Sequence, residues 1–223
     1  MTKLSLTIVA VSYLLGSIPF GYLLVRIFRG FDVRTTGSGN IGATNVSRAG
    51  KGLGLATLVL DALKGYAAVL VAGSLVSSDR FVSVVAGQIP GGYPSSAMAL
   101  SISSTLCALA GLIAILGHMF PVWLRFKGGK GVATAAGAFA ALAPRAMLLA
   151  LAAFAVVVAL TRYVSLASVV AAATFPFFAW WTAPPARTKV PVVFLMGISA
   201  ALIIVRHKDN IRRLLSGAED RFQ

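Results

Sequence analysis

GHMFPVWLRFKGGKGVATAAG, residues 117–137, places a short basic turn between two apolar segments. Apolar segments of this kind are typical of helices that cross a membrane, and positive charges between such helices gather at the membrane surface. The stretch therefore predicts two membrane helices joined by a turn at one face of the bilayer. The turn consists of two lysines and three glycines: Lys127, Gly128, Gly129, Lys130 and Gly131.

The composition of this turn is typical of a site that holds phosphate. Glycine allows backbone N–H groups to converge on one point, and the N-terminus of the helix expected from about Val132 adds the positive end of its dipole. Lys127 and Lys130 add full positive charges. The alternative is a basic cytoplasmic loop that only follows the positive-inside rule. Both interpretations stay open on this turn alone.

The overall composition is that of an integral membrane protein, because 58% of the 223 residues are hydrophobic and only 12% are charged. The formal net charge of +14 could indicate nucleic acid, but the basic residues form short clusters between apolar stretches. Anionic lipid headgroups and phosphorylated substrates are therefore the expected partners, and nucleic acid is not. Cys107 is the single cysteine, which excludes an internal disulfide and a CxxC metal site.

Seven apolar stretches predict an all-α membrane protein with about seven transmembrane helices in a single domain, residues 1–223. The stretches are at about 4–28, 53–76, 97–120, 132–143, 145–161, 164–181 and 190–206. The fourth has about a dozen residues where a spanning helix needs roughly 17 to 25, so a tilted, thinly covered or half-inserted segment is expected there. The first lacks the cleavage site of a signal peptide and is expected to be a retained helix, kinked near Pro19.

The distribution of lysine and arginine predicts that the N-terminus lies outside and the C-terminus in the cytoplasm. In this orientation cytoplasmic segments hold 14 of the 20 basic residues, outside segments hold 5, and Lys64 lies within a span. The cytoplasmic segments include 29–52, 125–131 and the tail from Arg206. Residues 77–96 become an external loop, for which a short interfacial piece at 81–89 is expected.

Residues 37–48, GSGNIGATNVSR, form a second polar segment between apolar stretches. They contain a GxGxxG pattern, but a dinucleotide-binding fold would require a βαβ unit here, and the flanks are predicted membrane helices. A Walker A loop at Lys130 is also excluded, because Leu124 and Gly131 replace its first glycine and its Ser or Thr. An ordinary connector would contain Gly, Ser and Asn too. The density of hydroxyl and amide groups favours a binding role.

Two pairs of polar residues are spaced to share one face of a helix. His207 and Asn210 are three apart in the basic tail segment 206–214, where they either bind substrate or anchor the chain at the membrane interface beside anionic lipid. Asp61 and Lys64 are three apart within the second span. Ionisable residues at membrane depth are costly and usually paired, so these two are expected to form an ion pair facing the bundle interior.

Five segments resemble the bacterial acyl-phosphate:glycerol-3-phosphate acyltransferase family. They are GSIPFGYLL at 16–24, GSGNIGATNVSRAGKGLG at 37–54, LDALKG at 60–65, GHMFPVWLRFKGGKGVAT at 117–134 and HKDNIRRLLSG at 207–217. The resemblance implies a seven-helix enzyme of phospholipid synthesis in the bacterial inner membrane, with its active site facing the cytoplasm. Such an enzyme moves a fatty acyl group from acyl phosphate to the 1-position of glycerol 3-phosphate and releases lysophosphatidic acid and phosphate. The resemblance implies no cofactor and no metal ion, and it suggests the enzyme that produces acyl phosphate as a further partner.

This reaction needs cations and N–H donors more than a nucleophile, because acyl phosphate is already activated and both substrates are anions. The residues expected to bind acyl phosphate are Lys127, Gly128, Gly129, Lys130, Gly131 and Thr134. Those expected to bind glycerol 3-phosphate are Ser38, Asn40, Asn45, Arg48, His207 and Asn210. The expected catalytic residues are Ser38, Arg48, Lys130, His207 and Asn210. The proton of the attacking hydroxyl goes either to the departing phosphate or to a neutral His207, and both routes stay open.

A transporter or channel for phosphorylated solutes is the competing class. It would place polar groups near the bilayer midplane, often in broken helices and with an internal repeat. In this sequence the polar motifs gather on one predicted face, and no repeat is visible. The enzyme is therefore the favoured interpretation.

Overall fold

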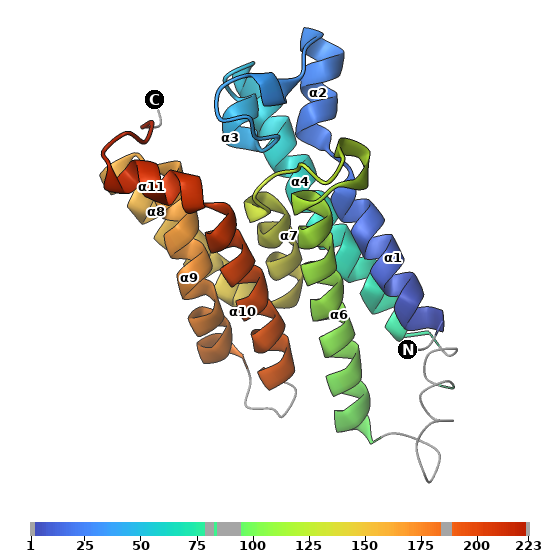
Figure 1. Ribbon diagram of the computed structural model, residues 1–223. Coiled ribbons are helices and arrows are strands. Elements are labelled where there is room, and N and C mark those ends of the chain that lie inside the picture. Colours follow the sequence, from blue (N-terminus) through green and yellow to red (C-terminus); the bar gives the residue numbers. More distant parts are fainter. Residues whose placement is uncertain (1–2, 79–82, 84–94, 184–188, 222–223) are drawn as a thin grey trace.

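The computed structural model describes residues 3–78, 83, 95–183 and 189–221, which form a bundle of helices without a β-strand (Figure 1). The elements are α1 Lys3–Ser17, α2 Phe20–Arg29, η1 Val33–Thr35, α3 Ala43–Val46, α4 Lys51–Val76, α6 Ser96–Met119, η2 Val122–Leu124, α7 Val132–Leu142, α8 Pro144–Thr161, α9 Val164–Thr182, α10 Lys189–Arg206 and α11 Lys208–Leu215. The all-α class is thus confirmed. The interfacial piece expected at 81–89 lies, apart from Ser83, outside the described residues.

Within the described ranges, five helical segments are long and apolar enough to cross a membrane, namely 3–29, 51–76, 97–124, 144–161 and 164–182. α10 and α11 together would add a sixth, although the chain bends by 55° between them. The chain is therefore a multi-pass membrane protein. α7 has 11 residues and a length of about 16 Å, roughly half the hydrocarbon thickness. The count of seven spans stays a prediction for this reason.

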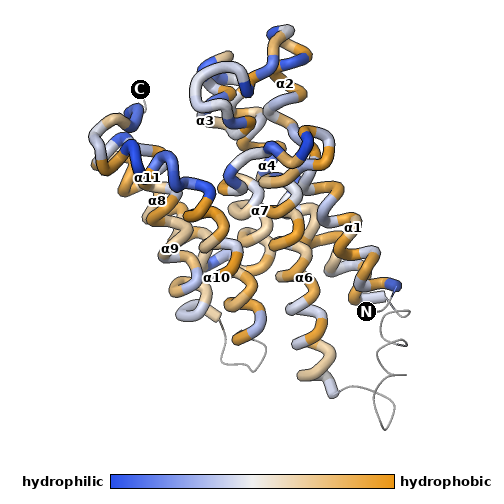
Figure 2. The backbone as a smooth tube through the Cα atoms, viewed as in Figure 1, coloured by the Kyte–Doolittle hydropathy of each residue, from blue (hydrophilic) through white to orange (hydrophobic). Residues whose placement is uncertain are grey.

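Polar residues gather at one end of the bundle, where α2, α3, α11 and the turn between α6 and α7 lie (Figure 2). The two termini lie at opposite ends (Figure 1), which fits an odd number of crossings. The three polar motifs of the sequence meet at the same end of the molecule. That this end faces the cytoplasm stays a prediction from the charge distribution.

The first span is broken at Pro19, as the sequence predicts. α1 ends at Ser17 and α2 begins at Phe20, because proline lacks the N–H group that would continue the helix. The carbonyl oxygen of Ile18 at this break accepts a hydrogen bond of 2.7 Å from Nζ of Lys64 in α4. Lys64 also lies 2.8 Å from Oδ1 of Asp61, so the predicted buried ion pair is confirmed.

Glycines allow the helices that flank the polar end to pack closely. A Cβ atom on Gly65 of α4 would lie 2.0 Å from the carbonyl oxygen of Thr134, and one on Gly137 of α7 would lie 1.8 Å from that of Ala62. Small residues at such crossings let two backbones touch in a membrane protein. α4 therefore fixes the position of α7, and with it the basic turn that precedes α7.

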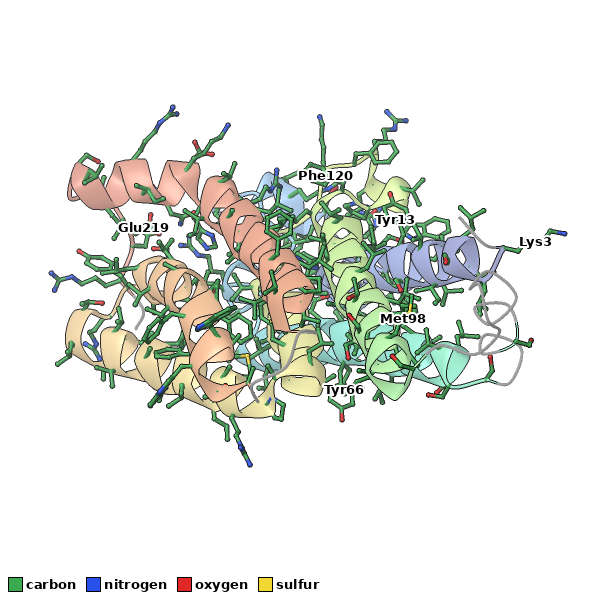
Figure 3. All side chains as sticks on the ribbon, turned by 90° about the horizontal axis from the view of Figure 1, so that it is seen from below. Lys3, Tyr13, Tyr66, Met98, Phe120 and Glu219 are labelled. Carbon is green, nitrogen blue, oxygen red and sulfur yellow. The ribbon has the colours of Figure 1, made fainter. Side chains whose placement is uncertain are left out.

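The turn is also tied to the first helix. Oη of Tyr13 in α1 donates a hydrogen bond of 2.7 Å to the carbonyl oxygen of Phe120, and the two residues lie close together in Figure 3. Phe120 follows the last residue of α6. The entry to the turn is thereby held against α1, and its exit against α4.

Candidate functional site

A pocket of about 880 Å³ lies at the polar end of the bundle, between the loop after α2, the turn between α6 and α7, and the junction of α10 with α11. We call it the polar pocket. The basic side chains that line it are Arg34, Lys127, Lys130, Arg206, Lys208 and Arg213. The acidic side chains in its described lining are Asp32 and Asp209. This excess of positive charge suits a phosphorylated ligand.

Half of the sequence-predicted site residues line this pocket: Ser38, Asn40, Lys127, Gly128, Lys130 and Asn210. Segments from three distant parts of the sequence therefore meet here. The other predicted residues lie around the pocket without lining it: Asn45, Arg48, Gly129, Gly131, Thr134 and His207.

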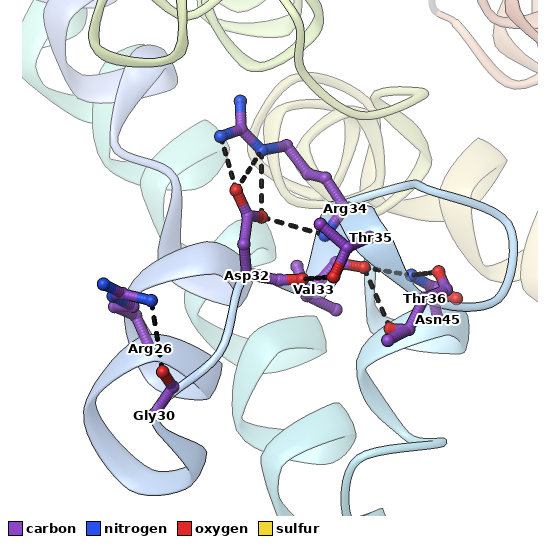
Figure 4. Close-up of polar contacts among 8 residues, drawn as sticks. All are labelled: Arg26, Gly30, Asp32, Val33, Arg34, Thr35, Thr36 and Asn45. Atoms are coloured by element: carbon purple, nitrogen blue, oxygen red, sulfur yellow. Dashed lines mark hydrogen bonds and ion pairs between the residues drawn. The ribbon is translucent and has the colours of Figure 1, made fainter.

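Asn45 is a buried residue that holds the loop together. Its Nδ2 group donates hydrogen bonds of 2.9–3.1 Å to three carbonyl oxygens, those of Val33, Thr36 and Asn40. Its Oδ1 accepts a hydrogen bond of 3.0 Å from the backbone N–H of Ser38. The contacts with Val33 and Thr36 are drawn in Figure 4. The amide is fully used within the loop, so Asn45 shapes the wall that presents Ser38 and Asn40 to the pocket.

The glycine turn differs from the expected cradle of free N–H groups. The N–H groups of Gly128 and Gly129 donate to the carbonyl oxygens of Met119 and His118 at 3.2 Å and 3.1 Å. The last carbonyl groups of a helix have no partner within the helix, and here the turn supplies donors for two carbonyls at the end of α6. Gly131 has a φ of 82° and precedes α7, where glycine is favoured. Thr134 is buried in the first turn of α7.

Arg206 fastens the turn from the other side. Its Nη2 group donates to the carbonyl oxygens of Gly128 and Gly129 at 3.2 Å and 3.1 Å, and its guanidinium lies 5.5 Å from the ring centre of Phe120. From the sequence, Arg206 was interpreted only as a marker of membrane orientation. An arginine at the end of an apolar helix gives no sequence signal that distinguishes an orientation marker from a residue that holds the turn.

Lys130 leads a chain of polar contacts into the C-terminal tail. Its Nζ donates to Oδ1 of Asn210, whose Nδ2 donates to Oε1 of Glu219 at 2.6 Å. Nε of Arg213 donates to the other oxygen of Glu219 at 2.7 Å. Burial lowers the pKa of Lys130 to about 8. The charge of Lys130 is therefore sensitive to pH and to any anion that enters the pocket.

His207 is buried directly after α10, with 2% of its surface exposed. Its Nδ1 lies 2.8 Å from the carbonyl oxygen of Ile203. A carbonyl can only accept, so Nδ1 carries the proton and Nε2 carries the lone pair. Burial lowers the pKa of His207 to about 4, which keeps the ring neutral at neutral pH.

Arg48 lies at the exposed rim of the site. Its Nη2 group lies 2.6 Å from Oδ2 of Asp220 near the C-terminus. Both side chains are well exposed, at 50% and 77%. An exposed ion pair of this kind contributes about 0–1 kcal/mol, so it opens readily.

A second pocket of about 750 Å³ adjoins the first and is mainly apolar; we call it the apolar pocket. Its lining comes from the break between α1 and α2, the start of α2, Arg34, and the turn residues Trp123, Leu124, Arg125 and Lys127. Arg34 and Lys127 line both pockets. Arg34 was not among the site residues predicted from the sequence, although the Asp-x-Arg spacing shortly before the glycine-rich segment could have indicated it.

In the described part of the chain, no group of three or more His, Cys, Asp or Glu side chains could hold a metal ion. The polar pocket is lined mainly by cations, with hydroxyl groups, amides and the carboxylates of Asp32 and Asp209, at the end of a membrane helix bundle and beside an apolar pocket. These features are typical of a membrane protein whose site suits an anionic ligand next to the lipid.

Comparison with known proteins identifies the family. The sequence profile described as "Glycerol-3-phosphate acyltransferase" matches residues 6–217, and the chain belongs to this family. The glycerol-3-phosphate acyltransferase of Geobacter sulfurreducens is 44% identical, covering 98% of this chain and 97% of that protein. The protein of the same name from Rhodospirillum rubrum is 47% identical, covering 94% of this chain and 87% of that protein.

Two crystal structures of PlsY (YgiH), an integral membrane glycerol 3-phosphate acyltransferase, share the fold. The glycerol 3-phosphate form aligns with a TM-score of 0.80 at 38% identity, covering 98% of this chain and 96% of that one. The lysophosphatidic acid form aligns with a TM-score of 0.78 at 37% identity, covering 98% and 95%. The resemblance drawn from the five sequence segments is thus confirmed at the level of the family.

Proposed function

We propose that this protein transfers a fatty acyl group from acyl phosphate to the 1-position hydroxyl of glycerol 3-phosphate. The observation that carries the proposal is the junction of the polar pocket with the apolar pocket at Arg34 and Lys127. Acyl phosphate is an amphiphile, and its anionic head and its chain each need one of these environments. PlsY supports the acceptor and the product, because its structures are described as the glycerol 3-phosphate form and the lysophosphatidic acid form.

The reaction requires no covalent intermediate on the protein. The hydroxyl oxygen of glycerol 3-phosphate attacks the carbonyl carbon of acyl phosphate, and the bond from that carbon to the phosphate oxygen breaks. The bonding electrons leave with the phosphate, which takes up the hydroxyl proton. The products are lysophosphatidic acid and inorganic phosphate.

The proposal favours the departing phosphate as the proton acceptor over His207. A phosphate group has a second pKa of about 6, whereas burial lowers the pKa of His207 to about 4. His207 is also absent from the described lining of the polar pocket. We therefore assign His207 a positioning role beside Asn210, which lies in the same tail segment and does line the pocket.

The two substrates are assigned to different walls of the polar pocket. Lys127 and Lys130 belong to the basic turn and would hold the phosphate of the donor. Ser38 and Asn40 come from the loop after α2 and Asn210 comes from α11, and these three residues would hold glycerol 3-phosphate. The hydrogen bond from Lys130 to Asn210 would then place the two substrates next to each other. Arg48 would join them when its exposed pair with Asp220 opens, since arginine is a bidentate phosphate ligand.

We further propose that the protein is a single membrane domain of the bacterial inner membrane, with the polar pocket on the cytoplasmic side. The excess of basic over acidic residues in the described lining of the polar pocket supports this orientation. It places the pocket in the compartment that holds soluble phosphorylated metabolites, and it leaves the enzyme that produces acyl phosphate as an expected partner.

In the deciding experiment, the purified protein in lipid is given glycerol 3-phosphate together with either acyl phosphate or acyl-CoA. We expect lysophosphatidic acid from acyl phosphate alone, because the turn presents lysines suited to a compact phosphate. Formation of product from acyl-CoA at the same rate would contradict the choice of donor. Absence of product with both donors would contradict the proposed reaction.

A further inference from the structure

Arg34 is the arginine that lines both pockets among the described residues. Its guanidinium is held by Asp32: Nε lies 3.0 Å and 3.1 Å from the two carboxylate oxygens, and Nη2 lies 2.6 Å from Oδ2 (Figure 4). Tyr22 lies against it, with the ring centre 5.2 Å from Cζ. Its side chain is 31% exposed, so the group is fixed in place and still reachable from the pockets.

The pairing with Asp32 leaves hydrogen-bonding capacity on Arg34. A guanidinium carries more N–H donors than one carboxylate engages, and Nη1 lies outside the pairing. The pKa of Asp32 is lowered, foremost by its hydrogen bonds from Arg34, so the carboxylate stays ionised and keeps its hold at neutral pH. Arg34 therefore presents an oriented cation at the joint between a polar and an apolar space.

We infer that Arg34 binds the acyl phosphate group of the donor at this joint. The inference rests on the proposed function, because it requires a ligand whose anionic head and apolar chain occupy the two pockets. The group that passes the joint is the one that links head to chain, namely the acyl phosphate itself. Lys127 lies at the same joint, but a flexible lysine supplies a point charge, whereas the fixed guanidinium also defines a direction.

The alternative is that Arg34 only stabilises its loop. The loop has contacts that do not need the guanidinium: Oδ1 of Asp32 accepts a hydrogen bond of 2.9 Å from the backbone N–H of Arg34, and the carbonyl oxygen of Asp32 accepts one of 3.0 Å from the N–H of Thr35. Replacing the Arg34 side chain leaves these backbone contacts in place. A purely structural role would affect both substrates alike.

The test compares Arg34→Met and Arg34→Lys with a matched control, Arg26→Met, in purified protein in lipid vesicles. Arg26 donates to the carbonyl oxygen of Gly30 at 3.1 Å and lines neither pocket. KM is measured separately for palmitoyl phosphate and for glycerol 3-phosphate. We expect Arg34→Met to raise KM for palmitoyl phosphate about ten- to a hundredfold, the range for a lost charge-assisted hydrogen bond. KM for glycerol 3-phosphate should match that of the control.

Arg34→Lys keeps the charge and should restore part of the affinity for the donor. The rise in KM for the donor in Arg34→Met should be the same for acyl phosphates with short and long chains, because the lost contact is with the phosphate head. Equal rises in both KM values, or a donor KM no higher than in Arg26→Met, would overturn the inference. If Arg34→Met does not fold, the two KM values of Arg34→Lys decide in the same way. If the wild-type protein forms no product in this assay, the proposed function is contradicted instead of this inference.

Discussion

Nζ of Lys64 lies 3.0 Å from Nδ1 of His118, although the two residues are 54 positions apart and belong to α4 and α6. The other side of the same imidazole faces the basic turn, since a Cβ atom built on Gly129 would lie 2.0 Å from Nε2 of His118. The ion pair of Lys64 with Asp61 thus extends through His118 to the basic turn, whose neighbouring residues Gly128 and Lys130 line the polar pocket. The basic turn therefore packs against the His118 ring, which Lys64 holds in place.

This contact predicts the effect of Gly129→Ala. The added methyl group would overlap the His118 ring, which is buried and bonded to Lys64 and cannot move aside at low cost. We expect the turn to shift and KM for acyl phosphate to rise at least about tenfold, a change worth roughly 1.4 kcal/mol. Steady-state kinetics with each substrate varied in turn would measure it.

Gly197→Ala is the matched control for this variant, because a Cβ atom at Gly197 meets no atom within 4 Å. It lies inside α10, where alanine is the better helix former, so activity should be unchanged. Wild-type kinetics in Gly129→Ala would show that the position of the turn is not important for the donor.

The lowered pKa of Lys130 predicts how activity depends on pH. Lys130 is charged below its pKa of about 8 and loses its proton above it, so KM for acyl phosphate should rise as the pH increases through about 8. Lys130→Arg keeps the charge at all these pH values and should remove this rise. A rise of the same size in Lys130→Arg would assign the dependence to another group.

The stability of the empty protein should change in the opposite sense. The unfolded chain binds a proton at Lys130 up to its ordinary pKa of 10.5, whereas the folded protein releases it at about 8. The unfolding free energy should therefore increase between these two pH values. Thermal unfolding of wild type and Lys130→Arg across this range would test it, since the variant lacks the contribution.

Arg48 and Asp220 form the exposed ion pair at the rim of the site, and replacing each of them should change KM for glycerol 3-phosphate in opposite directions. Arg48→Lys loses the planar fork and should raise KM for glycerol 3-phosphate about ten- to a hundredfold. Arg48 must separate from Asp220 before it can bind glycerol 3-phosphate, and Asp220→Asn weakens this ion pair. The variant should therefore lower KM for glycerol 3-phosphate, by at most about fivefold because the pair is exposed. Changes in the same direction for both variants would mean that the pair itself supports activity.

The orientation can be tested with single cysteines in a Cys107→Ala background. Ser47→Cys and Ser216→Cys should resist a membrane-impermeant thiol reagent in intact cells, because they lie at the end predicted to be cytoplasmic. Ser95→Cys lies at the other end and should react. Labelling at position 216 without labelling at position 95 would invert the predicted topology.

The fold was predictable because the cost of placing polar groups in lipid determines which stretches become membrane helices. The same cost predicted the ion pair of Asp61 with Lys64, now found at 2.8 Å. The break at Pro19 followed from the missing N–H group. These features depend on single residue types in an apolar surrounding, so the sequence alone contains the information.

The division of labour within the site was less predictable. The amide of Asn45 could bind a phosphate or a loop, and only the positions of the surrounding carbonyl groups show that the loop uses it completely. The N–H groups of Gly128 and Gly129 were expected to face the ligand. They donate instead to the last carbonyl groups of α6, which have no partner within the helix. Such assignments depend on contacts between distant parts of the chain.

The apolar pocket determines which concentration of the donor is relevant to the reaction rate, that in the membrane or that in water. Trp123 and Leu23 line it and are 62% and 38% exposed, so under the proposed function the chain of the donor would enter from the lipid side. The donor would then arrive by diffusion in two dimensions, while glycerol 3-phosphate arrives from water. Reaction rates should follow the mole fraction of acyl phosphate in the leaflet and decrease when inert lipid is added at constant total donor, as in surface dilution.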